Sequence, residues 1–170
     1  MKTLMIRRAL IVSVTALALG AAVAPIASAD PVQTVDYTAE PGSAPLQGSA
    51  HYAAPRHEIA VWEWDNRLKV DVQSGLEYLR IELSAPAGES LGVGTYTGAR
   101  FRGQSDPALS TSGFFVVAGG IGCGEVYADF TITRLDKDAD GKVTDADLTF
   151  VQRCFAPDAP AARGEVHFHA

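Results

Sequence analysis

The stretch between Cys123 and Cys154 constrains the fold of this chain more than any other part of the sequence. Two runs, at residues 126–134 and 145–154, alternate between apolar and polar residues, and the first is rich in the β-branched and aromatic residues that strands favour. Between them lies Asp140-Gly141, a turn dipeptide whose glycine accepts a positive φ at little cost. This pattern predicts a β-hairpin, which would bring the two cysteines close together.

The same stretch also matches the spacing of an EF-hand calcium loop. Counted from Asp136, oxygen donors fall at the positions that a calcium loop requires, with a glycine at the sixth position. The candidate ligands are Asp136, Asp138, Asp140, the Lys142 carbonyl and Asp147. An EF-hand needs a helix on each side, whereas the incoming run alternates as a strand does. We therefore favour the hairpin, and Ca²⁺ is a candidate cofactor rather than an established one.

Residues 1–29 have the pattern of a secretory signal peptide. Three basic residues precede an apolar run, which ends in the small-residue cleavage pattern Ala27-Ser28-Ala29. The apolar run is short for a membrane span. We expect cleavage after Ala29, secretion to the extracellular space and no membrane span in the mature chain. In an exported protein, an even pair of cysteines predicts a disulfide between Cys123 and Cys154.

The charge of the chain narrows the choice of partners. The formal net charge is −6, and loss of the basic signal peptide makes the mature chain more negative still. Such a chain is not expected to bind nucleic acid or an anionic membrane surface through charge, because both carry the same sign.

Shorter strand-like runs, most of them alternating and the one at residues 114–118 wholly apolar, fill the rest of the chain. They lie at residues 47–53, 58–64, 68–73, 78–83, 96–102, 114–118 and 164–169. Residues 30–45 show little periodicity and predict an extended N-terminal arm, which leaves residues 46–170 as a single domain. Strands at roughly ten-residue spacing predict an all-β fold: an antiparallel β-sandwich or partly open barrel of roughly eight strands, with one disulfide.

Several segments resemble a group of small secreted actinobacterial proteins of undefined function. The similar segments are Glu40-Pro41-Gly42 and residues 85–100, 120–123, 140–143, 150–154 and 160–168. The resemblance implies a β-rich fold, paired cysteines and a hairpin turn at Asp140-Gly141, but no activity. This chain departs from the group at Arg153, where a histidine is expected. It also has a fuller acidic pattern, with Asp136, Asp138 and Asp147. A calcium site here would therefore be a feature of this chain and not of the group.

Two further groups of residues are candidates for binding. Trp62 and Trp64 lie on one face of a predicted strand, where they could form a platform for sugar rings or a partner protein. His167 and His169 also share a strand face, and with His51 or His57 they could bind zinc or copper.

The sequence shows no phosphate-binding loop and no supported set of catalytic residues, so we do not expect an enzyme. We expect a secreted, non-catalytic binding or structural domain whose partner is an unknown protein or a cell-wall polysaccharide. A calcium-binding module is the alternative. An enzyme or an enzyme inhibitor is the third hypothesis, and no set of residues supports it.

Overall fold

A computed structural model describes residues 32–101 and 110–170 of the chain, and the predicted signal peptide lies outside these ranges. The described residues form eleven β-strands and no helix. They therefore contain no helix with the length and apolar character that crossing a membrane requires. The strands form two antiparallel sheets rather than a closed barrel, which confirms the predicted all-β class.

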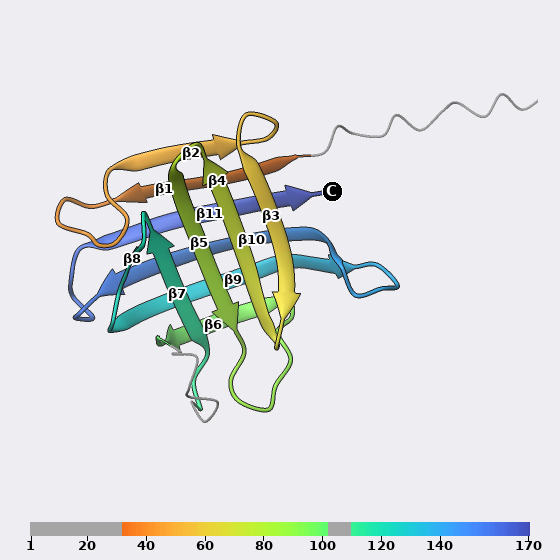
Figure 1. Cartoon of the computed structure of the whole chain (residues 1–170). Helices are drawn as coiled ribbons and strands as arrows, with labels where there is room; N and C mark the ends of the chain where they lie inside the picture. Colours follow the sequence, from red (N-terminus) through yellow and green to blue (C-terminus); the bar gives the residue numbers. More distant parts are fainter. Residues whose placement is uncertain (1–31, 102–109) are drawn as a thin grey trace, which may run out of the picture.

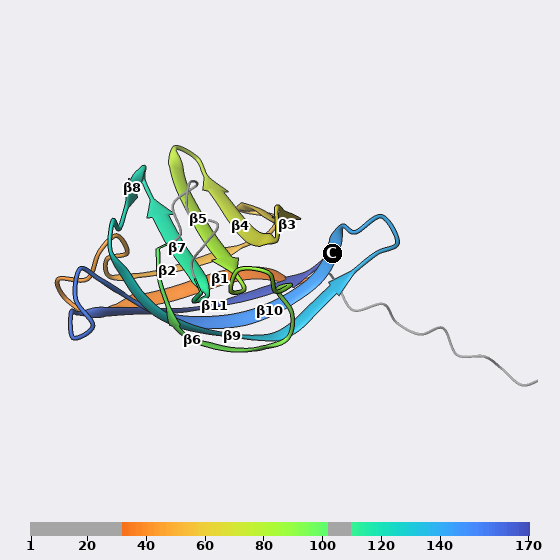
Figure 2. The same ribbon diagram turned by 90° about the horizontal axis from the view of Figure 1, so that it is seen from below.

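The larger sheet, sheet A, has six strands, and sheet B has five. In spatial order, sheet A contains β2 (Ser49–Ala53), β1 (Gln33–Ala39), β11 (Ala161–His169), β10 (Val143–Cys154), β9 (Val126–Lys137) and β6 (Gly94–Ala99). Sheet B contains β3 (Glu58–Trp64), β4 (Arg67–Ser74), β5 (Glu77–Ser84), β7 (Gly113–Ala118) and β8 (Ile121–Gly122). The strands of sheet B cross those of sheet A at a wide angle (Figure 1), and sheet A curves around sheet B (Figure 2). The two sheets are thus packed face to face.

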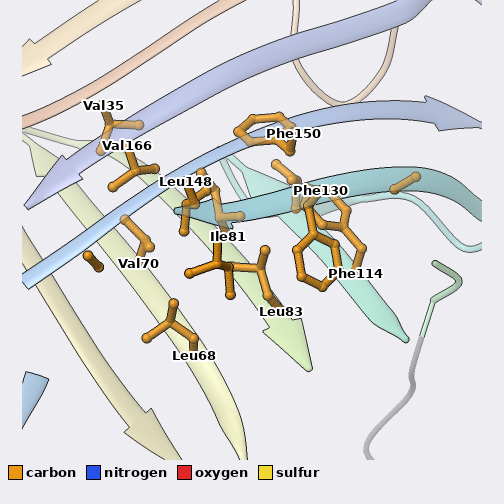
Figure 3. Close-up of a cluster of buried hydrophobic side chains, with 14 of the residues drawn as sticks. Val35, Leu68, Val70, Ile81, Leu83, Phe114, Phe130, Leu148, Phe150 and Val166 are labelled. Atoms are coloured by element: carbon orange, nitrogen blue, oxygen red, sulfur yellow. The ribbon is translucent and has the colours of Figure 1, made fainter. Parts of the chain in front are cut away.

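The core lies between the sheets because each strand turns alternate apolar residues inward. Phe114 of sheet B contacts two aromatic residues of sheet A, with ring centroids 6.1 Å from Phe130 and 5.3 Å from Phe150. Around them, Val70, Ile81 and other aliphatic side chains from both sheets are fully buried (Figure 3). Each such side chain contributes roughly 1.5–3 kcal/mol by leaving water.

Gly164 is the one position on β11 where the core depends on a missing side chain. It pairs with Phe150 on β10, and the Phe150 ring occupies the space that a Cβ would fill. A Cβ there would also lie 2.7 Å from the Asp36 carbonyl oxygen on β1. Glycine therefore lets the Phe150 ring pack against the backbone of β11, where the carbonyl oxygen of Asp36 also leaves no room for a Cβ.

The predicted hairpin is confirmed as the pair β9 and β10, which extends beyond the rest of the sheet (Figure 1). Its register contains an irregularity, because Leu148 pairs with Ile132 whereas Asp147 pairs with Arg134. Thr133 is thus an extra residue on β9, and its hydroxyl donates a hydrogen bond to the Asp147 carbonyl (3.2 Å). Such a bulge reverses the inward and outward alternation beyond it. Arg134 consequently shares the outer face of sheet A with Thr131.

The predicted disulfide is also confirmed. Cys123 and Cys154 are bonded, with their Cα atoms 5.7 Å apart, and both are buried. The bond joins the segment that enters β9 to the last residue of β10. It therefore closes the hairpin at the end opposite its turn.

The extended arm predicted at residues 30–45 is wrong for Gln33–Ala39, which form β1. This strand pairs with both β2 and β11, and Val35 is fully buried. Its period-two pattern covers only a few residues before Glu40-Pro41-Gly42, too few to stand out beside the prolines. Together with the two-residue β8, β1 accounts for most of the difference between eleven strands and the roughly eight expected.

Candidate functional site

The acidic turn between β9 and β10 is organised around Asp138. Its Oδ1 accepts hydrogen bonds from the backbone N–H groups of Asp140 (3.0 Å) and Lys142 (2.9 Å). The Lys142 carbonyl accepts a hydrogen bond from the Asp138 N–H (2.9 Å), and Gly141 takes the positive φ that the turn requires. Two of the oxygen atoms predicted to bind calcium, Asp138 Oδ1 and the Lys142 carbonyl oxygen, therefore accept hydrogen bonds that close the hairpin.

The other two predicted calcium ligands lie on the strands. Asp136 accepts a hydrogen bond from Arg134 Nε (2.8 Å), and Asp147 faces the histidines of β11. Asp147 is five residues beyond Lys142 on an extended strand, which places it roughly 17 Å further along the hairpin. The flanking helices of an EF-hand are absent from the described residues, where strands stand in their place. Calcium binding at the turn stays a prediction from the sequence.

Trp62 and Trp64 lie on the outer face of sheet B, as their spacing predicts. Trp64 is 64% exposed, whereas Trp62 is half-buried. The ammonium of Lys69 lies over both rings, 4.6 Å from the centroid of Trp62 and 5.3 Å from that of Trp64. These cation–π contacts stabilise the two rings within the protein itself.

Asp71 holds the rest of this face together. It accepts hydrogen bonds from Trp62 Nε1 (3.2 Å), the Tyr78 hydroxyl (2.9 Å) and, through both oxygens, the Arg80 guanidinium (2.6 and 2.8 Å). Burial alone would raise the pKa of Asp71, but the hydrogen bonds from Arg80, Tyr78 and Trp62 leave it below its ordinary value. Burial and the bond to Asp71 raise the pKa of Tyr78 to about 12. The polar groups of this face are thus largely paired with one another.

The outer face of sheet A carries a broad trough of about 790 Å³, within the usual size range of ligand sites. One row of cross-strand neighbours crosses all six strands of the sheet, and all but its last residue line the trough. In order, the row is His51, Asp36, Glu165, Thr149, Thr131 and Thr95. The sheet register therefore gathers hydroxyl, carboxylate and imidazole groups from distant parts of the chain.

Some side chains of the row form hydrogen bonds with one another, whereas others have no hydrogen-bond partner among the described residues. His51 Nδ1 lies 2.5 Å from Asp36 Oδ1, and the Thr95 and Thr131 hydroxyls are 3.1 Å apart. Glu165 and Thr149 are exposed at the centre of the row, and their side chains make no hydrogen bond to another described residue. The centre of the trough thus presents an open carboxylate beside an open hydroxyl.

The histidines of β11 lie on the same outer face, next to the trough. His167 Nδ1 is 2.8 Å from Asp147 Oδ1, and these two residues form a group with His169 that could hold a metal ion. His51 and His57 are not part of this group: His51 pairs with Asp36, and His57 Nδ1 accepts the Ala53 N–H. The carboxylate of Asp147 thus takes the place that we had expected a third histidine to fill.

Comparisons with protein-family models, with curated proteins and with solved structures found no match. The site must therefore be interpreted from its own chemistry.

The trough was missed by sequence reasoning. Each strand does show its outward residues through alternation, but which of them become neighbours depends on the order β2-β1-β11-β10-β9-β6. No local pattern in the sequence contains that order.

Proposed function

We propose that this chain is a secreted, non-catalytic binding domain that holds a neutral, hydroxyl-rich polysaccharide in the trough of sheet A. The observation that carries the proposal is the polar row that crosses the sheet and lines a trough of about 790 Å³. Hydroxyl and carboxylate groups in such a row can exchange hydrogen bonds with the hydroxyl groups of successive sugar units. A trough open across several strands suits a chain-like ligand better than a small molecule.

The composition of the trough favours a sugar chain over a protein partner. Protein interfaces depend on a few large apolar or aromatic anchors. Among the described residues, the exposed large hydrophobic side chains are Val32, Trp64, Leu76, Val93, Ile121 and Phe155, and none of them lines the trough. The lining offers threonines and charged groups, and its large apolar and aromatic members, Tyr37, Phe130, Phe150 and Val151, are buried or half-buried.

The charges of the trough favour a neutral chain. Three carboxylates line it, those of Asp36, Asp129 and Glu165, against the cationic Arg163 and the imidazole of His51. The whole chain also has a negative formal net charge, −6 before the signal peptide is removed, which likewise disfavours an anionic ligand. A polyanionic chain would be repelled by this face.

Secretion supports a ligand of the cell wall or its surroundings. It rests on the predicted cleavage after Ala29 and on the resemblance to small secreted actinobacterial proteins, and the disulfide fits an oxidising compartment. The competing surface for the same ligand is the aromatic face of sheet B, where Lys69 already lies over the rings of Trp62 and Trp64.

A pull-down with a panel of insoluble neutral polysaccharides, followed by calorimetry with soluble oligosaccharides, tests the proposal. Thr149→Arg places a long charged side chain at the centre of the trough and should abolish binding. Leu76→Arg adds the same side chain in the fully exposed turn between β4 and β5, and should bind as the unmodified protein does. Trp64→Ala reports on the competing face.

Binding that survives Thr149→Arg, or that is lost in Trp64→Ala, would remove the trough as the site. Failure of the whole neutral panel would refute the proposal, and binding of an acidic polysaccharide tested beside it would refute the preference for a neutral chain.

A further inference from the structure

Asp147, His167 and His169 bring three potential metal ligands together on the outer face of sheet A. Their ligand atoms all lie within 4.8 Å of one another. His167 pairs with Asp147 across β10 and β11, and His169 follows two residues later on the same face. The same Oδ1 atom of Asp147 is 2.8 Å from His167 Nδ1 and 3.1 Å from His169 Nε2.

We propose that these three residues bind a divalent transition-metal ion of the zinc or copper class. Imidazole nitrogen suits Zn²⁺ and Cu²⁺, and a carboxylate oxygen completes a set that both ions accept. With ligand bonds of about 2.0–2.2 Å, two ligands of a tetrahedral ion lie roughly 3.3 Å apart. The observed separations of 2.8 and 3.1 Å need only a small opening to reach this value.

The position of these residues on paired strands favours binding further. Two neighbouring strands fix all three Cα atoms through their backbone hydrogen bonds, so little freedom is lost when an ion binds. With three protein ligands, a tetrahedral ion keeps a fourth position for water or another ligand. The three side chains are half-buried, which leaves that position accessible from solvent.

Asp145 provides the outer support that metal-binding histidines usually have. Its Oδ1 lies 3.0 Å from His169 Nδ1, on the side of the ring opposite Asp147. A proton on Nδ1 donated to Asp145 leaves Nε2 free to face an ion beside Asp147. A carboxylate, a histidine and a metal ion aligned in this way form a common arrangement in metal sites.

Arg134 competes with this arrangement. Its guanidinium lies 3.2 Å from His169 Nδ1 and 3.0 Å from Asp145, and it reaches the outer face because of the bulge at Thr133. If Arg134 donates to Nδ1, the ring must carry its proton on Nε2, where the metal would bind. Metal binding therefore selects one of two ring tautomers, and removal of Arg134 should strengthen it.

The site is separate from the polysaccharide trough. None of its three ligands lines the trough, although Glu165 precedes His167 by two residues on the same face of β11. The two proposals can therefore fail independently.

Calorimetric titration of the protein, produced without a polyhistidine tag, tests the proposal with ZnCl₂, CuSO₄ and CaCl₂ at pH 7.5. We expect one saturable site for zinc and copper, and no calcium binding at these three residues. His167→Ala and His169→Ala should each abolish binding, whereas His51→Ala, which removes a histidine of the same sheet outside the cluster, should leave it unchanged. Asp145→Asn should weaken it about tenfold.

Arg134→Gln should bind the ion more tightly than the unmodified protein, an effect that a purely structural role of this residue would not produce. Thermal unfolding of each variant without metal shows whether it is folded. Absence of zinc and copper binding at millimolar concentration would overturn the proposal. Binding that persists in His167→Ala, or that depends on His51, would do so as well.

Discussion

Gly164→Ala tests the packing between β10 and β11 most directly. The new Cβ would lie 2.5 Å from Phe150 Cε1 and 2.7 Å from the Asp36 carbonyl oxygen, whereas carbon atoms in favourable contact are about 3.5–4.0 Å apart. The Phe150 ring must therefore move by about 1 Å. It is 97% buried and packs against Phe114, so it has little room to do so.

The expected cost follows from these contacts. Overpacking of a core costs about 1–3 kcal/mol, and here the backbone of β1 cannot rotate away as a side chain could. Replacement of glycine by alanine in a strand returns roughly 0.5–1 kcal/mol, because alanine loses less backbone entropy on folding. We expect Gly164→Ala to lower the free energy of unfolding by about 2 kcal/mol.

Urea denaturation followed by far-UV circular dichroism measures this free energy. Gly124→Ala is the matched control, because no atom lies within 4 Å of the Cβ that it would add. The double variant Gly164→Ala/Phe150→Leu removes the obstructing ring, so it should lose less stability than the two single changes combined. Equal stability of Gly164→Ala and the unmodified protein, or strict additivity in the double variant, would refute the reasoning.

Three further predictions concern bonds described above. Reduction of Cys123–Cys154, or its replacement by two serines, should lower the free energy of unfolding by about 3–4 kcal/mol, since the bond closes a loop with a sequence separation of 31 residues; a shift of the urea midpoint measures it, and no shift would contradict it. Asp71→Asn should cost about 1 kcal/mol at neutral pH, at the low end for charged hydrogen bonds because the site is partly exposed. Because the folded-state pKa of Asp71 is below the ordinary value of 3.8, its contribution to stability is present above that pH and is lost as the pH falls through the folded-state value. Acid unfolding of Asp71→Asn should therefore lack this component, and identical acid profiles of the two proteins would argue against it. Asp138→Ala should lower stability by about 1 kcal/mol equally with and without Ca²⁺, through loss of two turn hydrogen bonds; thermal unfolding in CaCl₂ and in EDTA checks this, and a loss seen only with Ca²⁺ would support a calcium site instead.

The hairpin and its disulfide could be predicted from the sequence because both depend on local information. The alternation in β9 and β10 and the Asp140-Gly141 turn lie within one stretch of chain. Residues of β1 alternate as well, but their place in the sheet depends on β11, at the other end of the described fold. The sequence pattern within such a strand is weak, because the strand is held in place by contacts with residues far away in the chain.

The outer-face clusters could not be predicted for two physical reasons. Asp147 was grouped with the acidic turn by sequence distance, whereas the β10–β11 register places it against His167. Unbroken period-two alternation would place Arg134 on the same face as Ile132, but the bulge at Thr133 turns it outward. A register and a bulge each arise from pairing between strands, and a period-two pattern within one strand contains neither.

The place of β1 also determines the order in which the molecule can be assembled. Gln33 pairs with Phe168, so the first of the described strands to be synthesised finds its main partner only after β11 has been made. Until then, β1 and β2 can form no more than a hairpin of their own, and sheet A lacks three of its six strands, β11 included. Pairing over such sequence separations has a high entropic cost and slows folding. The described part of the chain should therefore stay incompletely folded until β11 has been made, and it should reach its native state only in a late step that joins β1 and β2 to the rest of sheet A.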